Sequence, residues 1–545
     1  MNDTRVDLQA DGTRGDLEFH TIPRLLDLSK AKYESITAIE EGSVQITYGQ
    51  LYDSVMDAGR ALMAMDIRPH DRVAIWAPNI SEWIIAALAI QTVGATVVTI
   101  NTRYKGDEAA FILQKSGARA LFTIQGFLDT DYLELLQQSD VELPKLEHQI
   151  LLRGDKPPDA LSWSAFLERK EEVSEQALID RRNAVSPTHV SDILFTSGTT
   201  GHPKGVVVNH SQTLRAYRDW SHVVGLQQGD RYLVVVPFFH CFGYKAGWLA
   251  CLMMGATIVP QPVFDVDQVL ERIGPDRITV LPGPPALYQS ILAKKGLNRE
   301  KISSLRLAVT GAAVIPVQLI HDMKERLGFD TVITGYGLTE ASGIATMCRY
   351  DDPPKTIAQT SGRAIPGVEV KIVDTNGQPL PANETGEVMI RGYNIMQEYF
   401  DESEATQETI NQDGWLRTGD IGLLNEHGYI RITDRQKDMF LVGGFNAYPA
   451  EIENTLLQRK EIAQAAVIGV PDDRLGEVGA AYLVLKPDSE IDTEELHSWC
   501  REHMANFKVP RHFRVVTELP MNASGKVTKF VLRENFESQA LNEPI

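Results

Sequence analysis

The stretch "LRLAVTGAAVIPVQLIHDMKERLGFDTVITGYGLTE", residues 305–340, places two short β-branched runs on either side of a helical pattern. A strand ending near Val309, a helix, and a second strand ending near Thr334 make a βαβ unit, whose two strands are parallel. The Gly-containing loops "TGAA" and "GYGLTE" follow these strands. Because ligands bind beyond the carboxyl ends of the strands in such sheets, both loops are predicted to line one cleft.

The same succession of β-branched run, Gly/Pro loop and helical pattern recurs from about residue 70 to 350 and predicts a doubly wound α/β fold. From about Pro366 to Asp434, shorter runs such as "GVEVKIVD" and "GEVMIRG" predict a β-rich subdomain. The residues that follow have the pattern of a small α+β unit. Since 545 residues exceed one ordinary core, we predict a large domain of residues 1–434 and a small domain of residues 435–545.

The formal net charge of −20 disfavours binding to nucleic acid or to a membrane surface, because both depend on clustered Lys and Arg. The most apolar run, Trp83 to Ile100, is broken by polar residues and is interpreted as a buried helix and strand, not as an integral membrane segment. The four cysteines show neither disulfide-framework nor zinc-site spacing. With no apolar signal core at the N-terminus, a cytoplasmic location is expected.

The stretch "TSGTTGHPKG", Thr196 to Gly205, combines three glycines, four hydroxyl side chains and one lysine. Glycines let backbone N–H groups converge on phosphate oxygens. The stretch is not a Walker A loop, because Lys204 is followed by Gly205 and not by a hydroxyl residue. It predicts a phosphate-binding loop on another fold, and the plainer alternative is a polar turn between a strand and a helix.

Five motifs stand in one order along the chain: "TSGTTGHPKG", "GYGLTE", "GWLRTGD", "ITDRQKDMFLVGGFN" and "NASGK". Together they resemble the adenylate-forming superfamily of acyl-CoA synthetases, adenylation domains and luciferases, over almost the whole chain. "PFFHCFGYKAG" and "VLPGPPALYQS" look like AMP-forming acyl-CoA synthetases, particularly actinobacterial ligases for the propanoate side chain of steroid-ring remnants. The resemblance implies two half-reactions. The acid attacks the α-phosphate of Mg-ATP to give acyl-AMP and pyrophosphate, and the thiol of coenzyme A then displaces AMP.

The resemblance implies ATP, Mg²⁺ and coenzyme A as ligands and gives each motif a role. Glu340 would coordinate Mg²⁺, a hard cation that binds carboxylate and phosphate oxygens, and Thr339 would bond the α-phosphate. Tyr336 would stack on adenine, and Asp420 would accept both ribose hydroxyls. The residues that would hold the β- and γ-phosphates are Thr196, Ser197, Gly198, Thr199, Thr200 and Lys204. The remaining residues expected around the nucleoside are Gly311, Ala312, Ala313 and Arg435.

The resemblance also implies a mobile small domain. Lys526 of "NASGK" would reach the carboxylate and the α-phosphate during adenylation and stabilise the charge that shifts there. Lys437 would be the hinge about which the small domain turns, withdrawing Lys526. The glycines of "VGGFN", Gly443 and Gly444, would then line a tunnel for pantetheine. His240 would gate the approach of the thiol beside the acyl pocket, although a lone His in an aromatic run is more often part of the core.

Lys245 interrupts the aromatic stretch "FFHCFGYKAGW". An unpaired charge in an acyl pocket is costly, so this lysine must reach solvent, pair with a carboxylate, or meet an oxygen of the substrate. All three alternatives stay open at the level of sequence. The aromatic residues of the stretch predict a broad acyl pocket, and the sequence leaves open which of them face it; they are Phe238, Phe239, Phe242, Tyr244 and Trp248.

The function predicted from these features is an ATP-dependent carboxylic acid:CoA ligase acting on a fatty acid or a steroid-derived propanoate. An amino-acid adenylation enzyme serving a carrier protein would favour an acidic residue to hold the α-amino group, and "PFFHCFG" contains none. No motif requires the oxygenase chemistry of a luciferase. A catalytically inactive binding protein would be expected to have lost Lys526, Glu340 or Asp420, and all three are present. The sequence does not determine the oligomeric state, and a homodimer stays open.

Overall fold

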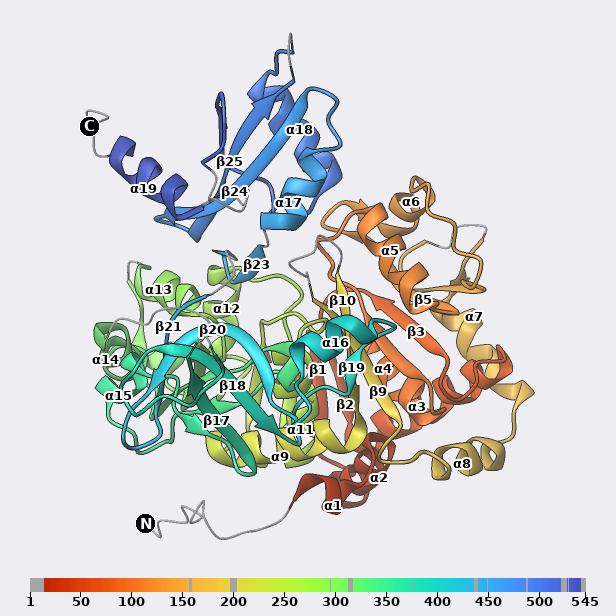
Figure 1. Cartoon of the computed structure of the whole chain (residues 1–545). Coiled ribbons are helices and arrows are strands. Elements are labelled where there is room, and N and C mark those ends of the chain that lie inside the picture. The colour runs from red at the N-terminus through yellow and green to blue at the C-terminus, as the bar shows by residue number, and fades with distance from the viewer. Residues whose placement is uncertain are drawn as a thin grey trace.

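The structure is a computed structural model that describes residues 14–540 apart from 156–158, 197–202, 295, 312–316, 375, 436–439, 448, 487–488, 521–526 and 528. Figure 1 shows a large body built from the residues before about 435 and a smaller body built from the rest. Several residues named above lie outside the described part, and they are Ser197, Gly198, Thr199, Thr200, Ala312, Ala313, Lys437, Lys526 and the side chain of Arg435.

A nine-stranded sheet forms one half of the large body, in the order β19-β10-β9-β4-β3-β5-β7-β8, with β6 beside β5. The path from β9 to β8 is parallel, whereas β10 is antiparallel to both β9 and β19. The strands are β3 (Arg72–Trp76), β4 (Thr96–Thr99), β5 (Ala120–Phe127), β6 (Thr130–Asp131), β7 (His148–Arg153), β8 (Leu161–Ser162), β9 (Val190–Thr196), β10 (Lys204–Asn209) and β19 (Glu398–Tyr399).

The second half of the large body contains two four-stranded sheets, β11-β12-β1-β2 and β13-β14-β15-β16. Single bridges from Val280 to Tyr232 of β11 and to Leu307 of β13 join the two. Their strands are β1 (Thr37–Glu41), β2 (Val44–Thr47), β11 (Arg231–Val234), β12 (Thr257–Pro260), β13 (Leu307–Gly311), β14 (Thr331–Tyr336), β15 (Thr346–Met347) and β16 (Arg363–Ala364).

Helices connect and cover these sheets (Figure 1). The longer ones are α2 (Ile22–Tyr33), α3 (Tyr48–Ala64), α4 (Ser81–Thr92), α5 (Gly106–Ser116), α8 (Glu175–Asn183), α9 (His210–Val224), α12 (Val266–Ile273), α13 (Pro285–Leu292) and α14 (Val317–Glu325). The shorter ones are α1 (Gly15–Phe19), α6 (Tyr132–Gln137), α7 (Trp163–Glu168), α10 (Cys241–Gly243), α11 (Ala250–Met254), α15 (Pro354–Gln359) and α16 (Ser403–Thr409).

The apolar run that begins at Trp83 forms α4 and β4, as predicted. A helix that is apolar on all sides is stable in water only when it is buried all round. All ten residues from Trp83 to Thr92 are at most 6% exposed, and every residue of β4 is buried. Across the described residues, no helix is both long enough and apolar enough to span a bilayer.

The βαβ unit at residues 305–340 is present as β13, α14 and β14, with parallel strands in register from Leu307 and Thr331 to Gly311 and Gly335. Each strand ends two residues later than the sequence pattern indicates. The reason is the glycine pair: a Cβ atom on Gly311 would lie only 2.9 Å from the carbonyl oxygen of Gly335. Two glycines therefore let both strands continue to the edge where the loops begin.

Two further sheets complete the chain, and their strand pairs are antiparallel except for β25 and β26, which are parallel. The first, β17-β18-β20-β21, is the β-rich subdomain, and its strands are β17 (Val368–Val373), β18 (Gly386–Gly392), β20 (Leu416–Leu424) and β21 (Ile430–Arg435). The small body holds β22 (Phe440–Val442), β23 (Phe445–Ala447), β24 (Ile462–Asp472), β25 (Gly476–Leu485) and β26 (His512–Val515) with α17 (Pro449–Leu456), α18 (Thr493–His503) and α19 (Lys529–Ala540). The boundary at 434/435 stays a prediction, and it falls within β21, one residue before that strand ends.

Candidate functional site

The hydroxyl-rich loop connects two neighbouring antiparallel strands, because Thr196 at the end of β9 lies opposite Lys204 at the start of β10. Its central residues are not described, but its two ends are. Thr196 Oγ1 lies 3.5 Å from Glu340 Oε1, and Lys204 Nζ lies 5.1 Å from the centre of the Tyr399 ring. One end of the loop therefore faces Glu340, which follows β14, and the other faces Tyr399 of β19 (Glu398–Tyr399).

Glu340 lies in a short 3₁₀ turn, η4 (Thr339–Ala341), directly after the "GYGL" loop. The Tyr399 hydroxyl donates to Glu340 Oε1 at 2.9 Å. Burial raises the pKa of Glu340, and the hydrogen bonds from Tyr399 and Thr196 oppose this rise. Among the described residues, no Lys or Arg side chain pairs with Glu340, and its side-chain partners there are the neutral hydroxyl groups of Thr196 and Tyr399.

This donor set fits Mg²⁺ bound together with a nucleotide. The described residues hold no group of three or more His, Cys, Asp or Glu side chains that could bind a metal ion without help. Mg²⁺ in nucleotide enzymes takes one or two carboxylates and obtains its other oxygens from phosphates and water. Glu340 supplies one such carboxylate, beside the ends of the predicted phosphate loop.

Sequence reasoning missed Tyr399, which the structure places against Glu340. Tyr399 lies in β19, a two-residue strand, and pairs with Val206 of β10. That pairing carries the tyrosine to the edge of the nine-stranded sheet where the loop begins. An isolated two-residue strand has no period that a sequence reader can detect, so only the pairing with β10 reveals the contact.

Tyr336 and Asp420 meet at the carboxyl end of β14. The Tyr336 hydroxyl donates to Asp420 Oδ2 at 2.5 Å, and Asp420 is 6% exposed. Asp420 lies opposite Arg435 in the register of β20 and β21. Gly311 pairs with Gly335, the neighbour of Tyr336. The structure therefore brings together four of the positions expected around a nucleoside: an aromatic ring, a fixed carboxylate, a glycine backbone and the backbone of Arg435.

His240 is exposed and precedes the short helix α10. The Phe242 backbone N–H donates to His240 Nδ1 at 3.3 Å, so the neutral ring carries its proton on Nε2. The next residue, Cys241, is different: burial raises its pKa to about 11, with Lys245 opposing the rise. Cys241 is therefore a thiol at neutral pH and not a nucleophile.

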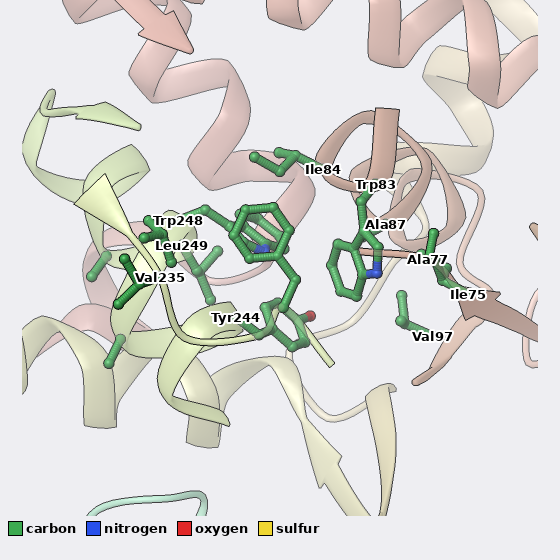
Figure 2. Close-up of a cluster of buried hydrophobic side chains, with 14 of the residues drawn as sticks. Ile75, Ala77, Trp83, Ile84, Ala87, Val97, Val235, Tyr244, Trp248 and Leu249 are labelled. Carbon is green, nitrogen blue, oxygen red and sulfur yellow. The ribbon is translucent and has the colours of Figure 1, made fainter. Parts of the chain in front are cut away.

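The aromatic stretch after His240 packs in the core to a greater extent than we predicted. Tyr244 and Trp248 stack at 4.8 Å, and Trp83 of α4 meets their rings edge-on at 5.8 and 6.0 Å (Figure 2). Phe238 is also fully buried and contacts Trp83. The sequence left open which aromatic residues face an acyl pocket, and the rings of Phe238, Tyr244 and Trp248 instead fill the space against α4. The two aromatic residues of the stretch that are only half-buried are Phe239 and Phe242.

Lys245 pairs with a carboxylate, which was one of the three alternatives. Its Nζ lies 2.8 Å from Asp192 Oδ1 in β9, and the two side chains are 1% and 0% exposed. The Ser191 hydroxyl donates to Asp192 Oδ2 at 2.7 Å. This ion pair is therefore fully removed from water and links the π-helical turn η2 (Tyr244–Leu249) to the strand that leads into the phosphate loop.

The glycine pair of "VGGFN" forms a tight hairpin between β22 and β23. Gly443 and Gly444 have φ values of 57° and 86°, and Val442 pairs with Phe445 across them. Positive φ at both central residues is the mark of a type I′ turn, which glycine adopts without strain. Residues with a side chain would be disfavoured at either position.

The hairpin is directed at the large body. The Arg103 guanidinium lies 4.3 Å above the ring of Phe445, and Phe445 stacks on Phe507 with ring centres 5.0 Å apart. A Cβ atom on Gly444 would lie 3.6 Å from Pro284 Cγ. Figure 1 shows β23 between the two bodies and α19, whose start follows "NASGK", at one side of the small one.

Comparison with known proteins places this site in a family. Residues 26–400 match the model of the AMP-binding enzyme family, and residues 451–526 match the AMP-binding enzyme C-terminal domain. The chain belongs to the AMP-binding enzymes. A 3-[(3aS,4S,7aS)-7a-methyl-1,5-dioxo-octahydro-1H-inden-4-yl]propanoyl:CoA ligase of Rhodococcus jostii (strain RHA1) is 47% identical to this AMP-binding enzyme over 517 residues, which cover 94% of this chain and 98% of the relative.

Two solved structures of one relative match this chain to different extents. A double mutant of o-succinylbenzoate CoA synthetase from Bacillus subtilis, bound with its product analogue OSB-NCoA, matches with a TM-score of 0.77 and 27% identity, over 94% of this chain and 98% of that one. The same synthetase with the acyl-adenylate intermediate OSB-AMP matches with a TM-score of 0.64 and 27% identity, over 93% and 97%. The predicted adenylate-forming α/β fold, with a large N-terminal and a small C-terminal domain, is confirmed.

Proposed function

We propose that this AMP-binding enzyme is an ATP-dependent carboxylic acid:CoA ligase that forms acyl-AMP and pyrophosphate, and then acyl-CoA and AMP. The observation that carries the proposal is the meeting of Thr196, Glu340 and Tyr399 beside the nucleoside positions Tyr336 and Asp420. A carboxylate is a poor electrophile because its leaving group would be oxide. Attaching AMP provides a leaving group, and the site has the parts that hold a nucleotide for this step.

In the adenylation step, the chain orients ATP from two sides. Asp420, fixed by the Tyr336 hydroxyl, would accept the ribose hydroxyls. Glu340 would hold the Mg²⁺ of Mg-ATP, which supplies positive charge to the phosphates, and Lys204 adds a second cation at the loop. Thr339 donates to the α-phosphate, and Arg435 joins Asp420. Lys526, outside the described residues, would complete the charge compensation at the reacting carboxylate.

The second half-reaction needs a path for a thiol. The Gly443–Gly444 hairpin supports such a path, because a turn without side chains lies against Pro284 at the junction of the two bodies. This chain is more similar to the product-analogue complex of the Bacillus relative than to its acyl-adenylate complex. That difference supports a domain arrangement suited to thioester formation. His240, exposed and with Nδ1 occupied by a backbone donor, would border the thiol's approach.

For the acid, we propose a propanoate carried by a bicyclic ring system with ring ketones. The support is the substrate for which the Rhodococcus relative is named, since that relative aligns with this chain over almost its whole length. The ligase would work in the cytoplasm, and a homodimer is the assembly to be tested by sedimentation. Neither of these points affects the chemistry, because every position named above belongs to one chain.

The first test compares acids. We expect kcat/KM for a keto-bicyclic propanoate to exceed that for octanoate by about 10-fold or more, since two ketone oxygens add hydrogen bonds that a saturated chain lacks. Both pyrophosphate release and acyl-CoA formation are measured. A preference for palmitate contradicts the substrate assignment, and pyrophosphate release without any acyl-CoA formation favours delivery to a carrier protein.

The hinge gives a second prediction. Proline at position 437 fixes φ and removes one N–H, so Lys437→Pro should oppose the backbone rotation between the two domain arrangements. We expect acyl-AMP formation to survive and thioester formation to fall sharply. Lys437→Ala, which leaves φ free, is the matched control and should retain both half-reactions. Unimpaired overall turnover of the proline variant would contradict the hinge assignment.

A further inference from the structure

A buried cluster of one lysine and two carboxylates joins the small body to the large one. Lys508 lies in the loop between α18 and β26, and its Nζ contacts both Glu108 of α5 and Glu451 of α17. The Lys508 side chain is 1% exposed, and those of Glu108 and Glu451 are 16% and 11% exposed. Among the side chains that the structure describes, this is the ion pair that crosses between residues before and after the predicted boundary.

Each member of the cluster is fixed by its own element. Glu108 is the third residue of α5, and its Oε2 accepts from the Lys105 backbone N–H at 2.9 Å, which leaves Oε1 for Lys508. Glu451 lies in the first turn of α17. The Lys508 ammonium also lies 4.3 Å from the centre of the Tyr104 ring, which comes from the large body. The large body thus supplies a carboxylate and an aromatic face, and the small body supplies the ammonium with its own carboxylate.

Burial and the neighbouring charges shift the pKa values of Lys508 and Glu451 in this cluster. Burial by itself lowers the pKa of Lys508, but the two carboxylates raise it well above its ordinary value. Burial raises the pKa of Glu451, and Lys508 opposes that rise. Lys508 and Glu451 belong to the same body and stay together when it turns, whereas Glu108 stays behind. Docking therefore adds a second carboxylate to an existing pair and removes all three groups from water.

The position of Lys508 connects this cluster to the thiol path. Its neighbour Phe507 stacks on Phe445, the residue that follows the Gly443–Gly444 turn. A body held at Lys508 by Glu108 thus also holds the hairpin against Pro284 and Arg103. The structure in which Lys508 meets Glu108 is more similar to the product-analogue complex of the Bacillus relative than to its acyl-adenylate complex.

We propose that Lys508 is a positioning residue for thioester formation, which docks on Glu108 and holds the small domain in the arrangement that presents the glycine hairpin to the large domain. The proposal rests on the ligase function proposed above. Lys508 touches neither substrate nor cofactor in this role. It favours one of two domain arrangements and so acts on the second half-reaction and not on the first.

The test separates the two half-reactions in Lys508→Met and Glu108→Gln. Methionine keeps the length of the side chain without its charge, and glutamine keeps the acceptor for the Lys105 N–H while removing the charge that Lys508 meets. We expect thioester formation from supplied acyl-AMP and CoA to fall about 10-fold or more in each, the usual loss for a charged hydrogen bond. Pyrophosphate release should stay within about twofold of the native rate. The double variant should be little worse than either single variant, because both remove the same contact.

Arg459→Met is the matched control, because Arg459 pairs with Glu461 and Glu495 inside the small body. It removes a cation without touching the junction, so the ratio of the two half-reactions should not change. Thermal melting of all variants identifies any that fold poorly. An equal loss of both half-reactions in Lys508→Met, an unchanged ratio, or additive losses in the double variant would each overturn the positioning role.

A distance measurement tests the docking without any reaction. The four cysteines are buried, so spin labels on Phe264→Cys and Val515→Cys, at native positions 42% and 51% exposed, report the separation of the two bodies. We expect Lys508→Met and Glu108→Gln to move population away from the native distance, and Arg459→Met to leave it. An unchanged distribution in the first two would overturn the proposal. If the native protein forms no acyl-CoA from any acid, the ligase function fails, while this measurement still decides the docking.

Discussion

Replacing Lys526 with Ala is expected to slow acyl-AMP formation by about 10²–10³-fold, the usual loss for one aimed donor in a water-excluded site. The reason is that charge shifts onto the α-phosphate and the attacking carboxylate as they react, and the remaining described cation at this end of the site is Lys204. Thioester formation from supplied acyl-AMP should persist, because the proposed role of Lys526 ends with adenylation. Rapid-quench measurement of acyl-AMP and acyl-CoA separates the two steps.

Lys529→Ala is the matched control for this prediction. Lys529 lies three residues further along, and its Nζ already pairs with Glu453 at 2.6 Å within the small body. Its loss should leave adenylation within a few-fold of the native rate. If the Lys526 variant lost both half-reactions to the same extent, the assigned role would be wrong and a folding defect would be the better explanation.

Lys245→Met is expected to cost about 3–5 kcal/mol of stability, although methionine matches the length of the lysine stem. The loss arises because Asp192 is left charged and completely buried, with Ser191 as its remaining described donor. Neither side chain can reach water, so solvent cannot screen the orphaned charge. The measurement is the shift in the guanidinium midpoint of the large-domain transition.

The double variant Lys245→Met/Asp192→Asn should recover most of that loss. With both charges removed, the cavity holds two neutral side chains of nearly native volume, and such replacements of buried ion pairs are often close to neutral. The same pair of variants tests the alternative that Lys245 meets a substrate oxygen. If the double variant is stable but loses the preference for the keto-bicyclic acid over octanoate, Lys245 also contributes to specificity.

The sequence by itself determined those features that depend on residues close together along the chain. The β-branched runs, glycine loops and helical period at residues 305–340 were sufficient to predict β13, α14 and β14, because each follows from the residues within one segment. The same holds for the apolar run that became α4 and β4. The order of five motifs led to the adenylate-forming superfamily, and the family match confirms that assignment. The roles given to single motif residues stay predictions.

The aromatic stretch after His240 shows the limit of local reasoning. An aromatic run has the same appearance in sequence whether its rings face a ligand or a neighbouring helix. Tyr244 and Trp248 are four residues apart and lie on one face of a helical turn, which packs on Trp83 of α4. Only the position of α4 decided that this face is core.

Tertiary structure alone decided which charged and polar side chains meet. Tyr399 lies 59 residues from Glu340 along the chain, and Lys508 lies 400 residues from Glu108. Hydrophobic period reports whether a face is buried, but it carries no information about which residue lies across from it. A buried charge is stable only beside a partner, and the partner is supplied by strand order and domain docking. For that reason the chemistry of the chain could be predicted from its motifs, whereas the contacts that position it could not.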